Sequence, residues 1–473
     1  MPGLTLSTNT PVAGASVRRP RPGVVLVTLL MCQLMIVLDM TVMNVALPHI
    51  QHDLGFSSSA LSWVMNAYTL VFGGLLLLGG RADDLVGRRR LLLAGIALFT
   101  LASLAGGFAE SSAWLLVARV LQGLGSAMAG PSTLALLTTT FTDVRARTRA
   151  LAWFSGVVSA GFAVGLVLGG LLTEWLSWRW VLFINVPVGL VVLALGARYL
   201  REPERRPARL DLPGALAATG GVAALVYGFI RAASDGWGTT TTLLSLAAGV
   251  VLVAAFLVIE TRTAEPLIPL RLFADRNRAT AYVNFFLGPM AGMSMFFFMT
   301  QYLQEIRGMS ALGTGFAFLP MALLAFGMSR FVPRLLPRFG PKPTALVGTA
   351  SMIAGVALLT QLSVSSGYFP TIFVSMLLMG FGMGLAFAPL NVIIMATVHT
   401  ADAGAAGGLL QTMQQTGATL GLAILVTVFG SVTRTATGSP HQILVSGMTS
   451  AFVASTIIAT LTFLVALTFR KVR

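Results

Sequence analysis

Fourteen apolar runs of 18 to 27 residues, separated by short loops, take up most of this 473-residue sequence. At about 1.5 Å per residue, helices of this length cross the roughly 30 Å hydrocarbon core of a bilayer. The loops leave no room for a sizeable soluble domain. The sequence therefore predicts an all-α integral membrane protein with fourteen transmembrane helices, at about residues 24–46, 60–80, 91–109, 113–137, 151–173, 180–197, 212–230, 241–259, 279–303, 311–329, 344–362, 370–396, 404–430 and 445–469.

Composition and charge placement exclude the common soluble classes. Hydrophobic residues make up 56% of the chain and charged residues 10%, against about 25% charged in a soluble domain. The net charge is +15, but the basic residues lie in short loops between apolar runs, which argues against nucleic acid. The first run carries Asp39 and is too long for a signal peptide. The single cysteine, Cys32, excludes an intramolecular disulfide.

The positions of Lys and Arg predict the orientation. With the N-terminus in the cytoplasm, the inner segments hold 26 of the 31 basic residues, the outer loops hold 4, and Arg119 lies within a run. This positive-inside bias also fits an even number of spans. We therefore expect a multi-pass protein of the cell (cytoplasmic or inner) membrane with both termini in the cytoplasm.

The two parts of the chain repeat a pattern. A basic loop centred on Gly87 follows the second run, and a basic loop centred on Gly340 follows the tenth. Six helices, two inserted helices and six helices would make these loops equivalent, which is typical of transporters with parallel repeats. The predicted segments are a cytoplasmic tail at 1–23, a six-helix bundle at 24–200, two inserted helices with flanking loops at 201–278, and a second six-helix bundle at 279–473.

Asp39 is the only charged residue in the run 24–46. A carboxylate in the membrane costs roughly 2.5–3.5 kcal/mol even on the lenient insertion scale, and such residues usually face a bundle interior and serve proton or ion traffic. Asp39 is therefore the leading candidate for proton transfer. A structural Asp held by neighbouring helices is the alternative.

The loop after the second run, residues 80–90, reads GRADDLVGRRR. Glycines let two helices meet in a tight turn, and a carboxylate with arginines can make charge-assisted bonds to helix ends. A simple positive-inside loop is the alternative. The stretch closely resembles the signature loop of the major facilitator superfamily. We predict a cytoplasmic latch made of Gly80, Asp84, Gly87, Arg88 and Arg89.

Four further stretches narrow the resemblance. Residues 38–48 resemble the first-helix motif of the fourteen-helix drug:proton antiporters (QacA/EmrB-type), and residues 63–68 follow the second-helix pattern. Residues 119–125 resemble the fourth-helix motif linked to proton coupling, and residues 178–187 resemble the start of the sixth helix. The resemblance covers nearly the whole chain. It implies the major facilitator fold and export of small molecules in exchange for protons.

Glycines spaced four residues apart, Gly161, Gly165 and Gly169, line one face of the fifth run, with Gly170 beside them. Such spacing allows close backbone contact between membrane helices. In the family this is the antiporter motif, which normally has a proline after the middle glycine, where this chain has Leu166. The packing face is predicted to persist, while Leu166 leaves the proline-linked kink without its residue.

Arg119 and Asp39 are expected at similar depth, roughly 10 and 13 Å from the outer ends of their runs. The family resemblance implies that both runs line the central cavity, so the two charges can sense each other. A nearby Arg favours the ionised carboxylate, while burial favours the neutral one. We predict that Asp39 carries the proton and that Arg119 modulates it. Arg119 bonded only to backbone carbonyls is the alternative.

Candidates for substrate binding are polar or aromatic residues within the apolar runs. Aromatic side chains adapt to many apolar ligands, and a few polar groups among them can orient a drug. Packing against other helices or lipid is the alternative for each. The predicted substrate residues are Asn44, Trp63, Asn66, Gln122, Tyr282, Asn284, Phe285, Phe297, Gln301 and Gln414.

These patterns predict a proton-coupled secondary active exporter of lipophilic drugs or antibiotics that works by alternating access. The alternative is a dedicated exporter of one secondary metabolite, and an integral-membrane enzyme is a remote third. We expect no catalytic residues, no metal and no cofactor, because the sequence has no P-loop and the proton gradient would supply the energy. The expected partners are the substrate, protons and lipid, but not nucleic acid. A monomer is expected to suffice.

Overall fold

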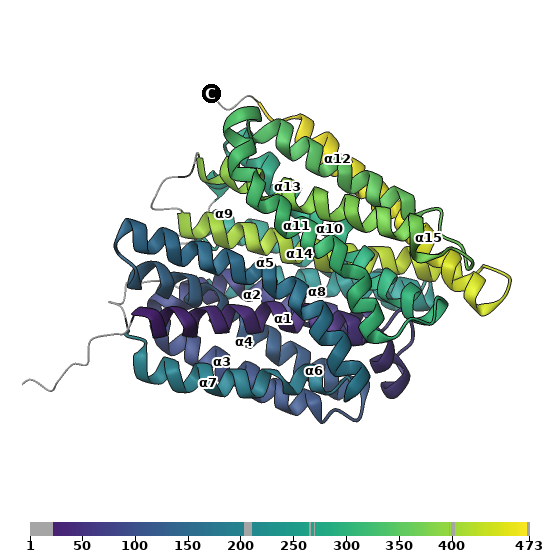
Figure 1. Cartoon of the computed structure of the whole chain (residues 1–473), viewed down its shortest axis with the longest axis horizontal. Helices are drawn as coiled ribbons and strands as arrows, with labels where there is room; N and C mark the ends of the chain where they lie inside the picture. The colour runs from purple at the N-terminus through teal and green to yellow at the C-terminus, as the bar shows by residue number, and fades with distance from the viewer. Residues whose placement is uncertain are drawn as a thin grey trace, which may run out of the picture.

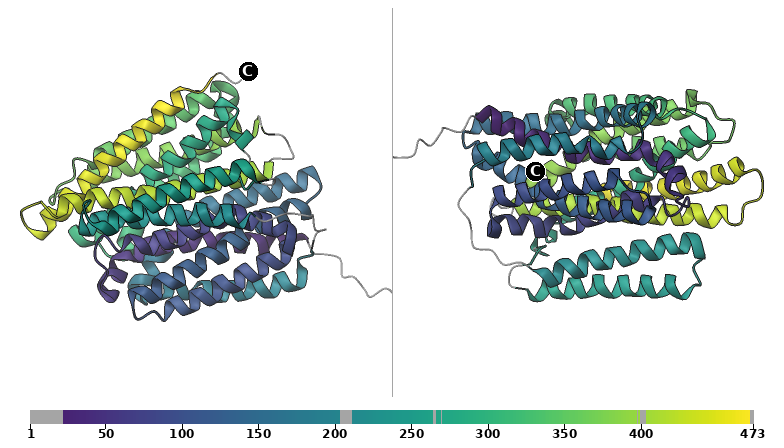
Figure 2. Two further views of the ribbon diagram at one scale, coloured as in Figure 1. Left: turned by 180° about the vertical axis from the view of Figure 1, so that it is seen from behind. Right: turned by 90° about the horizontal axis from the view of Figure 1, so that it is seen from below.

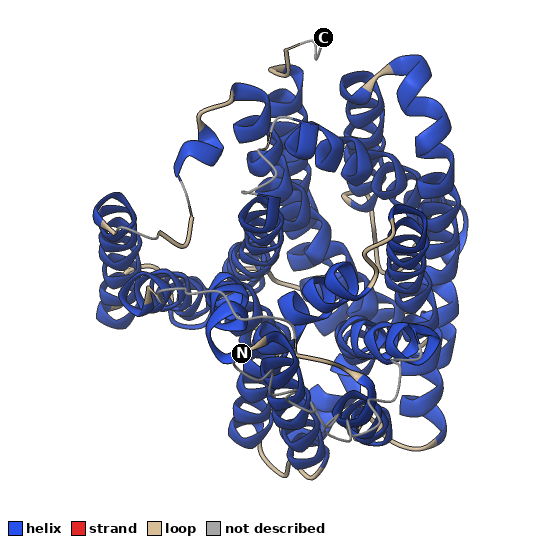
Figure 3. Cartoon of the chain, turned by 90° about the vertical axis from the view of Figure 1, so that its left-hand side faces the viewer, coloured by secondary structure: helices blue, strands red, loops and turns tan. Residues whose placement is uncertain are grey.

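The computed structural model describes residues 22–202, 211–263, 266–268, 270–396, 398 and 403–470. All regular structure among these residues is helical (Figure 3). It includes fourteen helical spans that are long and apolar enough to cross a membrane. The predicted all-α class and the fourteen spans are therefore confirmed.

Most spans are single α-helices, and three are interrupted. The sixth span breaks at Ile184, and π-helical turns end the ninth span and begin the twelfth. The elements are α1 (Pro22–Leu54), α2 (Ser62–Val86), α3 (Arg88–Gly107), α4 (Ser112–Thr140), α5 (Val144–Trp175), α6 (Trp180–Phe183), α7 (Asn185–Tyr199), α8 (Leu212–Asp235), α9 (Thr240–Arg262), η1 (Leu270–Phe273), α10 (Arg276–Gln301), η2 (Tyr302–Ile306), α11 (Ala311–Phe339), α12 (Pro341–Leu359), η3 (Tyr368–Ile372), α13 (Phe373–Ala396), α14 (Ala403–Thr433) and α15 (Pro440–Leu467).

The helices form two halves with the same packing order (Figure 1). In the first half α3 packs on α4, α4 on α2, and α1 on α5. In the second half α12 packs on α13, α13 on α11, and α10 on α14. Thus α1 corresponds to α10, α3 to α12, α4 to α13, and α7 to α15. The predicted arrangement of two six-helix bundles is confirmed.

The two basic loops are equivalent in detail. Gly87 (φ 108°) lies between α2 and α3, and Gly340 (φ 81°) lies between α11 and α12. Two residues after each glycine a basic side chain reaches the end of the last helix in its half. Arg89 Nη2 donates to the carbonyl of Ala197 at 2.6 Å, near the end of α7. Lys342 Nζ donates to two carbonyls at the end of α15, at 2.8 and 2.6 Å.

The inserted helices α8 and α9 pack tightly on each other and lie at one side of the molecule (Figure 2). Small residues bring them together, because a Cβ at Gly228 would lie 2.8 Å from Leu246. Helix α8 touches both halves: Thr427 of α14 donates to the carbonyl of Phe229 at 2.5 Å, and Gly74 of α2 packs on Thr219. The exposed apolar face of α9 fits the predicted peripheral position: Leu243, Leu244, Val250, Val251, Leu257 and Val258.

Helix α1 begins and α15 ends at the same end of the molecule, which we call the terminal end (Figures 1 and 3). Polar contacts join the two halves near the other end. Asn44 Nδ2 donates to Thr300 Oγ1 at 2.9 Å, linking α1 to α10. A Glu174 carboxylate oxygen accepts from the backbone N–H of Leu312 at 2.9 Å, linking α5 to the start of α11. Toward the terminal end α2 and α14 remain in contact, since an ideal Cβ at Gly408 would lie 2.8 Å from Leu77 (Figure 1).

Candidate functional site

Asp39 lies in α1 with only 1% of its surface exposed, and it accepts three hydrogen bonds. Arg119 Nη1 of α4 donates to Oδ2 at 2.5 Å. Gln122 Nε2, one turn further along α4, donates to Oδ1 at 2.9 Å. Asn185 Nδ2, at the start of α7, donates to the same oxygen at 3.0 Å. The carboxylate is therefore held from two neighbouring helices, and we call these four residues the Asp39 network.

Arg119 is completely buried and shares its guanidinium among several partners. Nη1 also donates to Gln122 Oε1 at 3.0 Å, and Nε donates to the carbonyl of Val64 in α2 at 2.9 Å. The guanidinium carbon lies 4.4 Å from the ring centre of Tyr68. Nη2 has no hydrogen-bond partner in the described part of the chain. The alternative in which Arg119 bonds only backbone carbonyls is therefore wrong.

A buried ion pair of this kind is sensitive to any movement of its members. Removing one partner leaves an uncompensated buried charge, which costs about 3–5 kcal/mol. A shift of α4 against α1 would separate the two charges, since each comes from a different helix. An ionised Asp39 left alone in the membrane would then be costly, and taking up a proton would neutralise it. The arrangement can thus link helix movement to proton binding.

Two polar residues around Asp39 were not predicted to lie there. Asn185 stands in the stretch 178–187, but nothing in that stretch pointed to the carboxylate. Ser103 of α3 accepts from Gln122 Nε2 at 2.8 Å, and so extends the network to a fourth helix. Gln122 was predicted to bind substrate, which stays a prediction, and its side chain contacts Asp39, Arg119 and Ser103. For Asn185 and Ser103, the signal available in the sequence was a polar residue within an apolar run.

The predicted latch residues lie at the terminal end of the first half. Arg89 and Arg90 donate their backbone N–H groups to the two carboxylate oxygens of Glu202, both at 3.2 Å, so Glu202 caps the start of α3. A Cβ at Gly87 would lie 2.7 Å from that carboxylate. The sequence did not predict the role of Glu202. Arg88 is half-buried, and Gly80 makes an ordinary contact, 3.7 Å from its ideal Cβ to Pro131.

Among the described acidic side chains of this loop, Asp83 engages α4. Asp83 is buried, with 3% of its surface exposed, and its carboxylate accepts a hydrogen bond from the Ser132 hydroxyl of α4. Asp84 belongs to α2, but its side chain lies outside the described part of the structure. The latch role of Asp84 stays a prediction.

The predicted glycine face of α5 is a close-packing surface in the structure. An ideal Cβ at Gly161 would lie 2.9 Å from Leu34, and one at Gly169 would lie 2.8 Å from the backbone of Val42. A Cβ at Gly165 would collide with the Thr41 hydroxyl. These three glycines therefore hold α5 against α1. Gly170 faces the second half instead, because its Cβ would lie 2.6 Å from the carbonyl of Ala311 in α11.

Among the described residues, one hydrogen bond joins two of the ten predicted substrate residues, from Gln301 Nε2 to the carbonyl of Phe297 at 3.3 Å. In the first half, Asn44 bonds across to α10, Trp63 packs on Tyr227 of α8 with ring centres 6.4 Å apart, and Asn66 is buried with its amide nitrogen unpaired among the described residues. Gln122 belongs to the Asp39 network. Their role in binding substrate stays a prediction.

In the second half the predicted residues lie on α10 and α14. Tyr282 donates to the carbonyl of Ala406 at 3.2 Å, and Phe285 packs on Phe387 with ring centres 5.7 Å apart. The remaining four are Asn284 and Gln301, which donate to carbonyls of their own helix, Phe297, which packs on Phe298, and Gln414, which is half-buried on α14.

Comparison with known proteins indicates the family of the chain. The family model of the Major Facilitator Superfamily matches residues 29–422. The chain is 43% identical to a puromycin resistance protein of Streptomyces alboniger, over 88% of this chain and 84% of that protein. It is 42% identical to a cephamycin export protein of Amycolatopsis lactamdurans, over 86% and 85%.

Solved structures share the fold at low sequence identity. A D-xylose–proton symporter matches with a TM-score of 0.66 and 12% identity, over 95% of this chain and 98% of that one. A bacterial homologue of the lysosomal transporter Spinster, in an inward-facing conformation, also gives a TM-score of 0.66, at 16% identity over 96% and 98%. With fourteen spans, two repeated halves and a family match over most of its length, the chain belongs to the major facilitator superfamily.

Proposed function

We propose that the protein is a proton-coupled antiporter that exports lipophilic drugs or antibiotics. The observation that carries the proposal is the buried Asp39 network, a carboxylate and a guanidinium that can exist together in the membrane only while they are paired. The names of the two relatives, a resistance protein and an export protein, support export of small molecules. The proton gradient supplies the energy, and no cofactor or catalytic step is required.

The cycle follows from the electrostatics of the pair. While Arg119 contacts Asp39, the guanidinium compensates the charge of the carboxylate. When α4 shifts against α1 and the pair separates, Asp39 binds a proton from the outer side. Return of Arg119 to the carboxylate displaces the proton toward the cytoplasm, and the substrate leaves by the opposite route. One proton therefore neutralises one buried charge in each cycle.

The proposed setting is the cell membrane with both termini in the cytoplasm. The distribution of Lys and Arg supports this orientation, with 26 on one side and 4 on the other. The terminal end would then face the cytoplasm, with the loop containing Gly87 and Glu202 on that side. The pair Asp39 and Arg119 lies within a single half, which supports the proposal that a monomer suffices.

The proposal is tested with the purified full-length protein in vesicles. An imposed proton gradient should drive uphill transport of a fluorescent lipophilic dye, and an uncoupler should abolish it. Asp39→Asn should remove uphill transport and keep exchange of neutral dye down its gradient. Glu110→Gln, at an exposed carboxylate outside the network, is the control and should transport normally. Full uphill transport by Asp39→Asn would contradict proton coupling at this residue.

A second candidate, a dedicated exporter of one secondary metabolite, is favoured by relatives whose names carry a single compound. Drug-susceptibility profiling in a host lacking its own efflux pumps separates the two. Resistance to several unrelated lipophiles supports the multidrug reading, while resistance to one compound from a panel that includes puromycin and a cephamycin supports the dedicated one.

A further inference from the structure

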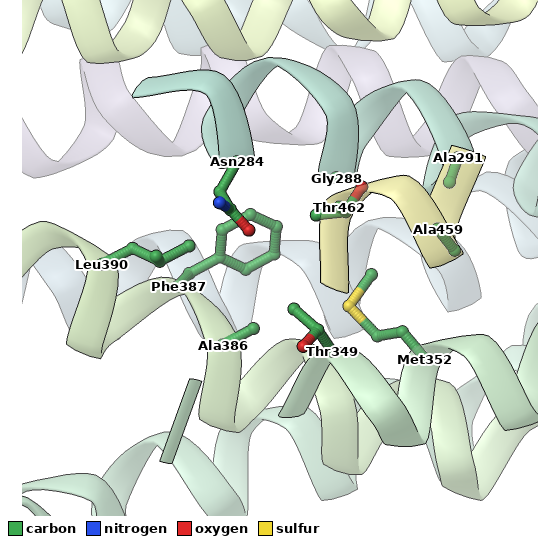
Figure 4. Close-up of a pocket in the computed structure, with 10 residues that line it drawn as sticks. All are labelled: Asn284, Gly288, Ala291, Thr349, Met352, Ala386, Phe387, Leu390, Ala459 and Thr462. Carbon is green, nitrogen blue, oxygen red and sulfur yellow. The ribbon is translucent and has the colours of Figure 1, made fainter. Parts of the chain in front are cut away.

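A small cavity lies inside the second half, apart from the Asp39 network (Figure 4). Four helices enclose it: α10 contributes Asn284 and Gly288, α12 contributes Thr349, α13 contributes Phe387, and α15 contributes Thr462. These helices are the counterparts of α1, α3, α4 and α7, which surround Asp39 in the first half. The space open to the centre of a water molecule is about 20 Å³.

Each of the three polar side chains around the cavity donates a hydrogen bond to a carbonyl of its own helix. The amide nitrogen of Asn284 and the hydroxyls of Thr349 and Thr462 each donate to the carbonyl four residues earlier, at 2.9, 3.0 and 2.9 Å. All three residues are at least nine-tenths buried. What they offer to the cavity is therefore acceptor lone pairs.

The amide oxygen of Asn284 is the most demanding of these acceptors. It is buried, and it has no hydrogen-bond partner among the described residues. Figure 4 shows this oxygen on the cavity side of the Asn284 side chain, with the nitrogen directed away. A buried polar atom without a partner is costly, so such atoms in native proteins usually bind ordered water.

We propose that this cavity holds one ordered water molecule, which donates one hydrogen bond to Asn284 Oδ1 and the other to a threonine hydroxyl oxygen. A water molecule needs about 10–15 Å³ of such space and two to four polar partners, and the cavity meets both conditions. A drug-sized substrate is far too large. Three neutral oxygens are too few ligands for a bare metal cation. Asn284 would then serve the internal packing of the second half through this water.

Two glycines of α10 provide a matched test. An added Cβ meets nothing within 4 Å at Gly288 or at Gly292, and the two lie one turn apart on α10, but only Gly288 lines the cavity. In Gly288→Ala the methyl group takes the space of the water and leaves Asn284 unpaired, so the thermal unfolding midpoint of the full-length protein in detergent should fall by about 2 °C. Gly292→Ala should raise it, because alanine favours helix over glycine.

Pro289 follows Gly288, so the methyl group of Gly288→Ala also crowds the proline. The change in thermal midpoint caused by Gly288→Ala is therefore measured in the wild type and in Asn284→Ala. With Asn284→Ala there is no amide oxygen to leave unpaired, and Gly288→Ala should then be at least about 2 °C less destabilising than in the wild type. Equal effects in both backgrounds would overturn the proposal, as would a midpoint that rises with Na⁺ but not with K⁺. A high-resolution structure should show the water in the wild type and lose it in Gly288→Ala.

Discussion

Arg119 holds the Asp39 network together because its guanidinium serves several partners at fixed angles. One nitrogen bonds Asp39 and Gln122, another bonds the carbonyl of Val64, and the plane lies near the ring of Tyr68. A planar fork with five N–H donors can do this, while a lysine ammonium is a compact point charge. We therefore expect that a positive charge alone at this position would not hold the Asp39 network together.

We expect Arg119→Lys to lower the initial rate of proton-driven export at least about tenfold, since loss of one well-placed charged hydrogen bond costs about 1.5–3 kcal/mol. Arg179→Lys, at a partly exposed ion pair with Asp53, is the matched control and should stay near the wild-type rate. Export by Arg119→Lys at the control rate would show that charge alone is enough.

Gly87 and Gly340 allow a second comparison between single residues. Both have positive φ, but a Cβ at Gly87 would meet the Glu202 carboxylate, whereas a Cβ at Gly340 meets nothing within 4 Å. Alanine in this sparsely populated backbone region costs about 1–3 kcal/mol at either site. Gly87→Ala should also displace the cap of α3 and lower the thermal midpoint further than Gly340→Ala. Equal losses would show that the Glu202 cap adds nothing.

The pair Asp39 and Arg119 could be predicted because two charges at similar depth in apolar runs have few other partners. Asn185 and Ser103 could not, since a single polar residue in a run does not reveal which neighbouring helix it faces. The contact of Asp83 with Ser132 was equally inaccessible, since the sequence does not show which side of α2 faces α4.

Helix α5 packs on both halves through its small residues. Gly161, Gly165 and Gly169 pack on α1, and Gly170 packs on the start of α11. Glycine spacing made the face predictable, but the sequence did not indicate which helix would cover it. Helix α1 also continues to Leu54, beyond the predicted end at 46, because its last two turns are polar and fall outside an apolar run.

We expect Gly165→Leu to abolish export, since even a Cβ there collides with the Thr41 hydroxyl and forces α5 away from α1. Gly156→Leu is the matched control, because a Cβ at Gly156 on the same helix meets nothing within 4 Å. It should retain export. Both variants are compared for membrane expression and thermal midpoint as well as transport. Normal export by Gly165→Leu would remove close packing of α5 and α1 from the mechanism.

The two halves of the molecule share a fold but differ in the acidic residues of their helices. Asp39 and Arg119 lie in the first half, while α10 to α15 carry no Asp or Glu, and Glu305 of η2 is partly exposed near the far end of its span. A dication held near the middle of the membrane would want two negative partners, and Arg119 already neutralises the one that is present. We therefore predict that the transporter favours neutral or singly charged lipophiles and handles dications poorly.

Paired dyes of similar size, one a monocation and one a dication, test this expectation in vesicles under the same proton gradient. The monocation should be exported at least several-fold faster. Asp39→Asn should reduce uphill export of both dyes, because it removes the coupling group. Equal or faster export of the dication by the wild type would mean that a second negative site serves the substrate.

The helices α8 and α9 cross the molecule once in each direction, and therefore α7 ends and α10 begins at the same end. An even number of spans leaves the orientation of every later helix unchanged, so the pair can be gained or lost without inverting the second bundle. The main attachment of α8 is to α14, through Thr427 and through Arg434, whose guanidinium donates to two carbonyls of α8 at 2.9 and 2.6 Å. The pair is thus attached mainly to the second bundle, and we predict that a shortened, twelve-span version of the chain keeps the orientation of that bundle.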